Sequence, residues 1–167
     1  MSLSVMIETD GDWDSSGASW DAIADKALHA AIAESAFPQL ATNARDCEVS
    51  LALLDDDAVR TLNREWRDKD KPTNVLSFPM ADAADFDRED GPPLLLGDIA
   101  MAYGVCAREA SEKRVPIETH ASHLMIHGML HLLGYDHQVD TAAEDMEARE
   151  TRAAARLGHP DPYGDKD

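Results

Sequence analysis

The sequence predicts an α+β fold with four short strands and about five helices. Two observations predict this class. Short apolar or alternating segments have the composition of strands while longer segments have helical periodicity, and the two kinds do not alternate regularly as in a doubly wound sheet. The 167 residues carry no internal repeat and no low-complexity linker, so we expect a single domain spanning residues 1–167.

The four predicted strands are short and rich in aliphatic residues. In the second strand, Val49, Leu51 and Leu53 alternate with polar or small neighbours, which is typical of a strand with one buried face. An acidic stretch containing Gly and Pro, residues 81–93, separates the third strand from the fourth, and we expect it to be a loop. The predicted strands are residues 4–8, 47–54, 74–79 and 94–102.

Capping residues and apolar stripes predict four of the helices. The third is the longest, because Pro116 suits its first turn and Gly134 is placed to end it in the left-handed conformation. In the fourth, Thr141 and Glu144 have the spacing of a capping box, and Gly158 marks the end. These helices are expected to begin after Ser19, at the acidic run 55–57, at Pro116 and at Thr141.

The composition predicts a soluble globular protein. Hydrophobic residues make up 44% of the chain and charged residues 29%, and no apolar run approaches the roughly 18 residues that a membrane span needs. The acidic N-terminal stretch lacks the basic and apolar regions of a secretory signal. Cys47 and Cys106 lie far apart and match no metal or redox spacing. We therefore expect a cytoplasmic location, no disulfide and no membrane partner.

The charge of the chain is strongly acidic but unevenly distributed. A formal net charge of −18 works against non-specific binding to nucleic acid. Residues 59–71 are an exception, with five basic side chains against three acidic ones. The basic residues are Arg60, Arg64, Arg67, Lys69 and Lys71. A polyanion would have to be bound locally at this segment, and the alternative interpretation of the segment is an ordinary charged helix end.

Five of the seven histidines fall within residues 120–137. Helical spacing places His123, His127 and His131 on one face of the third predicted helix. At about 1.5 Å rise per residue, the first and the last are some 12 Å apart, so only neighbours in the row can share one metal ion. For His120 and His123 we expect packing or hydrogen bonding rather than metal ligation.

The pair His127 and His131 has a third candidate ligand. Because Gly134 lets the chain leave the helix, the next turn can bring His137 back over the helix end, and Asp136 could orient a ligand or cap that turn. Three imidazoles with an open fourth position are typical of a catalytic zinc site, whereas structural sites fill all four positions. We predict one Zn²⁺ per chain, although three imidazoles also suit Ni²⁺, Cu²⁺ and Fe²⁺. The alternative is a purely structural histidine cluster.

The stretch HGMLHLLGYDH, residues 127–137, resembles a zinc-peptidase helix without its base. In HExxH peptidases the glutamate takes a proton from the metal-bound water, and Gly128 stands in its place. Another residue could supply the base, the metal hydroxide could suffice, or the substrate could bring its own nucleophile. We expect the glycine to leave room beside the metal for a large substrate group. Phosphodiester hydrolysis is then favoured over amide hydrolysis, because phosphoryl transfer depends mainly on positioning and charge neutralisation.

Four motifs, in order along the chain, resemble those of the YbeY-type endoribonucleases, the bacterial ribosomal RNA maturation factors. HGMLHLLGYDH is similar to the signature of that family, and the other three motifs are WRDKDKPTNVLSFPM, LLGDIAM and LGHPDPYG. The resemblance extends over most of the chain. It implies an α+β fold in which helices surround a small four-stranded mixed β-sheet and a cleft holds the metal.

The resemblance also implies a site and an activity. His127, His131 and His137 match the metal ligands of the family, usually zinc. Arg67 matches its critical arginine, which is thought to face the RNA phosphate, so these four residues are the expected catalytic residues. The implied activity is metal-dependent cleavage of single-stranded RNA, with roles in trimming the 3′ end of small-subunit ribosomal RNA and in ribosome quality control.

Three hypotheses for the function follow. The first is a metal-dependent endoribonuclease in which the metal carries a hydroxide or the scissile phosphate, Arg67 stabilises the transition-state charge, and either water or the RNA 2′-hydroxyl attacks. The second, a metallopeptidase, is disfavoured by Gly128. The third is a non-catalytic ribosome assembly factor with a structural metal.

Because the acidic surface weakens RNA binding, we expect the ribosome or ribosomal proteins to help place the RNA. Asp98 either supports the metal ligands or satisfies backbone donors at a strand end.

Overall fold

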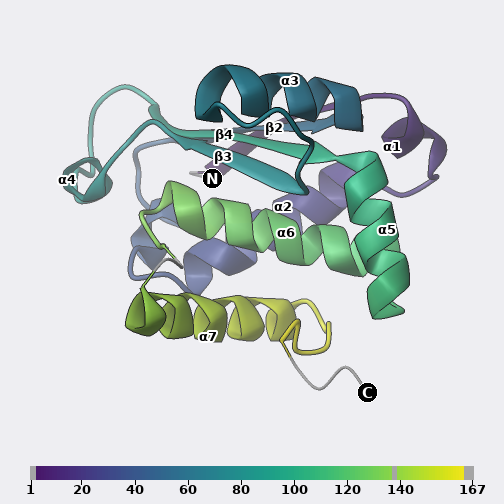
Figure 1. The fold of residues 1–167 in the computed structure, drawn as a ribbon. Coiled ribbons are helices and arrows are strands. Elements are labelled where there is room, and N and C mark those ends of the chain that lie inside the picture. The colour runs from purple at the N-terminus through teal and green to yellow at the C-terminus, as the bar shows by residue number, and fades with distance from the viewer. Residues whose placement is uncertain (1–2, 137–138, 164–167) are drawn as a thin grey trace.

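A four-stranded sheet forms the centre of the computed structural model, which describes residues 3–136 and 139–163 (Figure 1). The strands are β1 (Leu3–Thr9), β2 (Cys47–Leu54), β3 (Val75–Pro79) and β4 (Leu94–Ala102). Their order across the sheet is β1-β2-β4-β3, with β1, β2 and β4 parallel and β3 antiparallel to β4. The sheet is therefore mixed, and each predicted strand agrees with the observed one to within one residue at either end.

Helices cover both faces of this sheet. In Figure 1, α3 lies on one face, α2 and α6 lie against the other, and α7 packs on these two. The helices are α1 (Asp12–Ser15), α2 (Trp20–Ala33), the 3₁₀-helix η1 (Pro38–Ala41), α3 (Asp56–Arg67), α4 (Ala83–Phe86), α5 (Tyr103–Lys113), α6 (Ile117–Leu132) and α7 (Asp140–Arg156). The α+β class is confirmed. The prediction of about five helices was too low, because the short helices α1, η1 and α4 were not predicted, and α4 interrupts the expected loop at 81–93. Only four of the helices were assigned to residues, and α5 was not among them. No helix in the described residues is long and apolar enough to cross a membrane.

Strand β4 contributes side chains to both layers. Because successive side chains of a strand point to opposite faces, Ile99 and Met101 belong to the large core on the α6 side. Ala100 and Ala102 instead pack with Val59 of α3 in a smaller cluster. This alternation decides which residues of β4 can approach the histidines of α6.

Helix α6 is enclosed by the sheet, α2 and α7. Pro116 occupies its N-cap position, and Gly134 follows its end with a φ of +97°, a left-handed conformation that favours glycine. Both ends lie where the sequence predicted them. Within residues 120–132, only His123, His127 and His131 are not fully buried. The histidine row is therefore the one accessible edge of an otherwise buried stretch of helix.

The start of α7 corrects one prediction. The helix begins at Asp140 with Val139 at its N-cap, and no side-chain hydrogen bond caps it. Thr141 thus lies inside the first turn, and the predicted capping box between Thr141 and Glu144 is wrong. At the other end the prediction is close, because Gly158 follows the helix with a φ of +79°.

Candidate metal centre

Two histidines of α6 bring ring nitrogens together. The ring centroids of His127 and His131 lie 4.6 Å apart, whereas those of His123 and His127 lie 6.4 Å apart. The Nε2 atoms of His127 and His131 are 3.1 Å from each other. The pair that the sequence predicted to share a metal ion is therefore the pair whose nitrogens converge.

Hydrogen bonds on the far side of each ring fix the positions of the ring protons. His131 Nδ1 lies 2.8 Å from the carbonyl oxygen of Tyr135, which can only accept, so Nδ1 donates. His127 Nδ1 lies 3.0 Å from Oε1 of Glu150. Burial raises the pKa of Glu150, but hydrogen bonds from His123 and His127 outweigh burial and lower that pKa to about 2. The carboxylate is thus ionised at neutral pH and also accepts.

When both rings are neutral, their Nε2 atoms consequently carry lone pairs that point at each other. Two lone pairs at 3.1 Å repel unless a cation lies between them, which is either a metal ion or a shared proton. Two nitrogen ligands of a tetrahedral zinc ion, each about 2.0–2.1 Å from it, lie about 3.3 Å apart. The geometry of His127 and His131 therefore fits a zinc ion bound by both rings.

The third predicted ligand, His137, lies outside the described residues. In the part of the chain that the structure describes, no three His, Cys, Asp or Glu side chains are arranged to hold one ion. The nitrogens of His127 and His131 thus converge, and metal ligation by these two histidines and by His137 stays a prediction.

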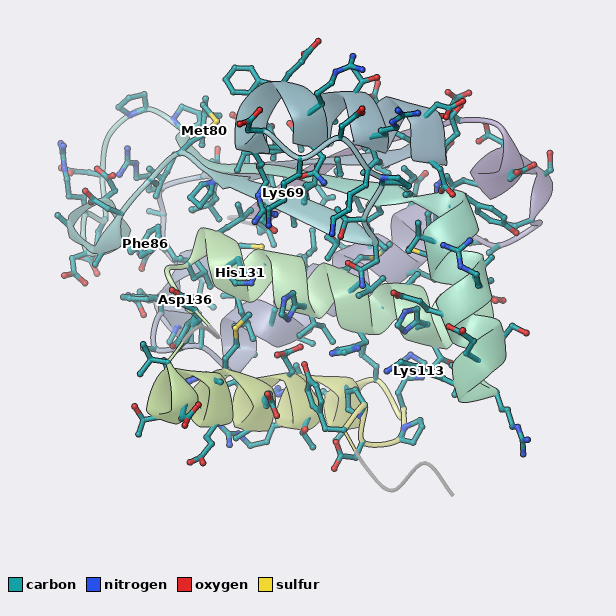
Figure 2. The ribbon with its side chains drawn as sticks, viewed as in Figure 1. Lys69, Met80, Phe86, Lys113, His131 and Asp136 are labelled. Carbon is teal, nitrogen blue, oxygen red and sulfur yellow. The ribbon has the colours of Figure 1, made fainter. Side chains whose placement is uncertain are left out.

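The turn that leads toward His137 is anchored on both sides. The Tyr135 hydroxyl accepts a hydrogen bond from the backbone N–H of Ala36 at 2.8 Å. The guanidinium of Arg149 lies over the Tyr135 ring, 4.9 Å from its centroid. Asp136 is drawn just beyond the end of α6 that carries His131 (Figure 2). The Tyr135 carbonyl that orients His131 is therefore fixed in space.

His120 and His123 are engaged in hydrogen bonds, the role expected for them. His120 is buried, and its Nε2 lies 2.8 Å from Oε1 of Glu109 on α5. Burial lowers the pKa of His120, while the carboxylate of Glu109 opposes that shift. His123 Nε2 lies 2.7 Å from Oε1 of Glu150. Neither ring contributes to the converging pair of nitrogens.

Glu150 is the site residue that the sequence analysis missed. It lies on α7, is fully buried, and contacts the histidine row across the interface with α6. A signal was present, since this acid interrupts the buried apolar side of α7 formed by Met146, Ala153 and Ala154. An acid on the buried side of a helix predicts a paired charge, because an isolated buried carboxylate is very costly.

Gly128 faces the sheet rather than the histidines. A Cβ atom at this position would lie 3.2 Å from Cγ2 of Ile99 and 3.2 Å from Oγ of Ser77. The Ser77 hydroxyl also donates to the Gly128 carbonyl oxygen at 3.3 Å. The expectation that this glycine leaves room for substrate beside the metal is therefore wrong. Its small size lets α6 pack closely against β3 and β4.

Arg67 is the last residue of α3. Asp68 follows with a φ of +59° and turns the chain into the loop that leads to β3. Because Ser77 of β3 contacts α6, this loop runs from the α3 side of the sheet toward the edge that borders α6. In Figure 2, Lys69 of this loop is drawn between α3 and His131. The part of the predicted phosphate-binding segment that follows Arg67 thus runs toward the edge of the sheet next to α6, whereas residues 59–67 belong to α3.

Some basic residues of this segment are already paired. Arg60 donates to both carboxylate oxygens of Asp70 at 2.8 and 3.2 Å, and Arg64 lies 3.8 Å from the same carboxylate. The interpretation as a charged helix end therefore fits these two arginines. The remaining basic residues, Arg67, Lys69 and Lys71, are all exposed.

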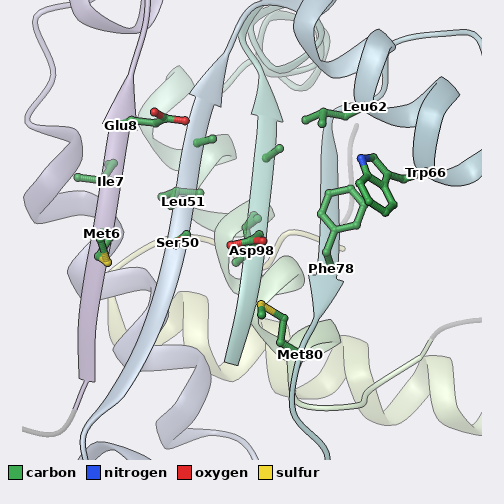
Figure 3. A pocket seen from close by; sticks show the side chains of 13 residues that line it. Met6, Ile7, Glu8, Ser50, Leu51, Leu62, Trp66, Phe78, Met80 and Asp98 are labelled. Carbon is green, nitrogen blue, oxygen red and sulfur yellow. The ribbon is translucent and has the colours of Figure 1, made fainter. Parts of the chain in front are cut away.

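A pocket of about 820 Å³ lies on the face of the sheet opposite the histidines (Figure 3). Asp98 is exposed in this pocket, because it alternates along β4 with Ile99, which faces α6. Support of the metal ligands by Asp98 is therefore wrong. Glu8 adds a second acid, and none of the described residues that line the pocket is Lys or Arg. Its rim includes Trp66 and Met80, which are 71% and 59% exposed.

Comparison with known proteins identifies the family of the chain. The sequence profile of the family described as Endoribonuclease YbeY matches residues 9–158. Endoribonuclease YbeY of Rhizorhabdus wittichii is 48% identical over 164 residues, which cover 96% of this chain and 96% of that protein. Endoribonuclease YbeY of Erythrobacter litoralis is 56% identical over 125 residues, which cover 71% of this chain and 76% of that protein.

A solved structure shares the fold. The solution structure of TM1509 from Thermotoga maritima superposes with a TM-score of 0.54 and 21% sequence identity, over 97% of this chain and 100% of that one. At this identity the likeness concerns the fold alone. The profile match covers residues 9–158, and the two relatives are 48% and 56% identical over most of the chain. These matches therefore show the family as well as the fold. The chain belongs to the endoribonuclease YbeY family.

Proposed function

We propose that the protein is a metal-dependent endoribonuclease that cleaves single-stranded ribosomal RNA. The observation that carries the proposal is the convergence of the His127 and His131 Nε2 atoms at 3.1 Å, in a chain whose relatives are named endoribonucleases. The proposed substrate is the 3′ end of small-subunit ribosomal RNA, and the proposed cellular setting is ribosome maturation and quality control.

Three histidines bind the ion, and two other groups hold two of these histidines in position. His127, His131 and His137 hold one ion, which we expect to be Zn²⁺. When bound, the ion supplies Lewis acidity toward a phosphate oxygen and lowers the pKa of a water ligand to about 7. The Nδ1 protons of His127 and His131 are held by Glu150 and by the Tyr135 carbonyl, which turns both Nε2 atoms to the same point.

The nucleophile is either water or the RNA 2′-hydroxyl. Gly128 provides no base and is packed against the sheet, so the proton route of HExxH peptidases is not built into this helix. RNA carries its own nucleophile beside each phosphate, which peptides do not. A 2′,3′-cyclic phosphate on the products would mark attack by the 2′-hydroxyl, and linear ends without that intermediate would mark attack by water.

Replacing Arg67 by alanine is expected to lower RNA cleavage by about 10²–10³-fold, because a positive charge aimed at the transition-state phosphate is lost. Zinc content should stay at the wild-type level, since Arg67 is at the end of α3 whereas His127 and His131 are on α6. The measurement is the cleavage rate of a single-stranded RNA with the small-subunit 3′-end sequence, at saturating zinc, together with elemental analysis of bound zinc.

Arg64→Ala is the matched control, because Arg64 is on the same helix, is exposed and lies near the carboxylate of Asp70. Its cleavage rate should remain within a few-fold of wild type. If zinc-replete Arg67→Ala cleaved RNA as fast as wild type, the role given to Arg67 would be wrong.

A ribosomal partner is the second part of the proposal. The net charge of −18 leaves free RNA weakly attracted to the protein as a whole. The pocket on the sheet combines the acids Glu8 and Asp98 with the exposed side chains of Trp66 and Met80. This chemistry complements a basic, partly apolar segment of a ribosomal protein, which would bring the enzyme to its RNA.

Asp98→Lys tests this contact. Reversing the charge in the pocket should weaken binding to purified small ribosomal subunits by about tenfold or more, because like charges then face each other. Cleavage of free RNA should be unchanged, since Asp98 faces away from α6. Glu144→Lys makes the same charge change at an exposed position of α7 and should bind normally. Equal binding by the two variants would place the partner elsewhere on the surface.

We infer a cytoplasmic location for this activity. Both cysteines, Cys47 and Cys106, are buried and form no disulfide. Burial raises the pKa of each thiol, so neither has the reactivity of a redox cysteine. A reducing compartment in which ribosomes mature suits this state.

A further inference from the structure

We propose that Tyr163 and Glu150 act in series to position the metal ligand His127, so that the C-terminal turn of the chain sets the affinity of the site for its ion. This inference rests on the metal site of the proposed function and extends it to residues outside the ligand set. Neither residue touches the metal or the RNA in this scheme. Both are positioning residues that act through an imidazole.

The first step is the bond between Glu150 and His127. Oε1 of Glu150 lies 3.0 Å from His127 Nδ1, and the ring donates. A carboxylate at Nδ1 fixes the tautomer with Nε2 free of a proton, holds the ring plane, and raises the basicity of the nitrogen that binds the ion. His127 is thereby held in the tautomer and orientation that bind a metal even when no ion is present.

The second step is the bond between Tyr163 and Glu150. The Tyr163 hydroxyl donates to the same Oε1 at 2.9 Å, and its ring stands edge-on to His123 with centroids 5.3 Å apart. Burial raises the pKa of the Tyr163 hydroxyl, and the charge of Glu150 adds to that shift, so the hydroxyl stays a donor. Three donors then converge on one oxygen: His123, His127 and Tyr163.

The turn after α7 places Tyr163 at this position. Gly158 ends the helix in the left-handed conformation and lets the chain reverse. Oδ1 of Asp161 then accepts from the hydroxyl of Thr151 at 3.0 Å and from the backbone N–H of Tyr163 at 2.8 Å. This pins the turn to the helix that carries Glu150. Residues 157–163 thus form an ordered turn that brings the Tyr163 hydroxyl to Glu150, the residue that contacts His127.

Stability alone does not account for a carboxylate at this place. A buried ion pair is often no more stabilising than well-packed apolar residues of similar volume. Here Oε2 of Glu150 and Nδ1 of His123 are buried and have no hydrogen-bond partner among the described residues. An apolar residue would avoid the cost at Oε2 but would leave three donors, on His123, His127 and Tyr163, without their acceptor. Of these three, only His127 is a predicted metal ligand, so the carboxylate links the buried network to the ion.

The experiment compares zinc affinity in four full-length proteins. These are wild type, Glu150→Gln, Tyr163→Phe and the control Glu144→Gln, which removes the same charge from an exposed position of α7. Affinity is measured by competition with a chromogenic zinc chelator, and circular dichroism of each metal-free protein reports its fold. Glu150→Gln should bind zinc about 10–100-fold more weakly than wild type, the usual effect of losing such a partner. Tyr163→Phe should lose less, and Glu144→Gln nothing.

The double variant Glu150→Gln/Tyr163→Phe tests the order of the two steps. If Tyr163 acts through Glu150, the second substitution should have no further effect on zinc affinity, whereas independent structural effects would add. Wild-type affinity in folded Glu150→Gln overturns the proposal. Should Glu150→Gln fail to fold, wild-type affinity in Tyr163→Phe overturns it equally, because that side chain is 42% exposed and its hydroxyl can be removed without a cavity in the core.

The outcomes separate this proposal from the proposed function. Zinc affinity that depends on Glu150 and Tyr163, in a wild type that does not cleave RNA, would support the positioning role and contradict the ribonuclease. RNA cleavage by wild type with unchanged zinc affinity in the variants would do the reverse. A wild type that binds no zinc would contradict both.

Discussion

His131→Ala is expected to lose zinc binding and RNA cleavage together. The substitution removes one of the two Nε2 atoms that converge at 3.1 Å, and the remaining imidazoles cannot complete the ligand set. The loss of zinc affinity should exceed the roughly 10–100-fold that removal of a partner behind a ligand causes. The measurement is cleavage of the 3′-end RNA substrate by identically purified wild type and variant, with bound zinc quantified in both.

Thermal unfolding gives an independent readout of the same change. Free zinc at 100 times its Kd stabilises a protein by about 2.7 kcal/mol. For a chain of this length the Tm of wild type should then rise by roughly 5–10 °C. His131→Ala should show no such rise, because it no longer binds the ion in its folded state.

His29→Ala is the control for both measurements, since it removes an imidazole from α2, outside the histidine row. It should behave as wild type. Equal cleavage by wild type and His131→Ala would reveal a contaminating nuclease. Together with a retained zinc response in wild type, that result would favour the assembly factor with a structural metal.

Gly128→Glu, which rebuilds the HExxH motif, is expected to destabilise the fold and to create no peptidase. A Cβ atom there would already lie 3.2 Å from Ile99 and from Ser77, so the longer side chain would have to enter the interface between α6 and the sheet. An unpaired carboxylate buried in that interface should cost about 3–5 kcal/mol. The gain in helix propensity over glycine, at most about 1 kcal/mol, does not offset this cost.

Urea unfolding of the metal-free protein measures the effect of Gly128→Glu. Thr119→Glu is the matched control, because it places the same residue in the first turn of the same helix at a partly exposed position. Its stability should change little, and the N-terminus of a helix favours an acid. A Gly128→Glu protein as stable as wild type would show that the residue does not face the sheet.

Local patterns were enough to locate the sheet and the converging histidines. The alternation in residues 47–54 and the apolar run in 94–102 are determined by burial on a pleated strand, so sequence and structure agree there to the residue. His127 and His131 meet because residues four apart are neighbours on any helix. Such features need no knowledge of what packs against the segment.

Helix α5 was not located because its cap comes from a distant part of the chain. It follows β4 directly, and no side chain at its own N-cap makes a capping hydrogen bond. Instead, the backbone N–H of Val105 donates to Oδ1 of Asp56, on α3, at 3.2 Å. A Cβ at Gly104 would collide with that same carboxylate. The signal for this helix start lies 49 residues away, where no local pattern reveals it.

The direction in which side chains point was the second feature that the sequence could not predict. The sequence predicts Gly128 beside the metal and leaves two roles open for Asp98, because sequence alone does not show which neighbour each face of an element meets. The structure turns Gly128 to the sheet and Asp98 to the opposite pocket. Glu150 was missed because its partners, His123 and His127, lie on a different helix and at least 23 residues away.

The enclosure of α6 and the exposure of the C-terminal turn predict very different rates of amide hydrogen exchange within one site. Amides of residues 121–132 are buried between the sheet, α2 and α7, so they should exchange only when the whole domain unfolds. The amides of His159, Asp161 and Tyr163 belong to partly or fully exposed residues and should exchange through local opening at small cost. The helix that carries His127 and His131 would thus be the slowest to exchange, while the segment that sets the zinc affinity would be among the fastest. Solution conditions that loosen only the C-terminus would then change zinc affinity while leaving the global free energy of unfolding unchanged.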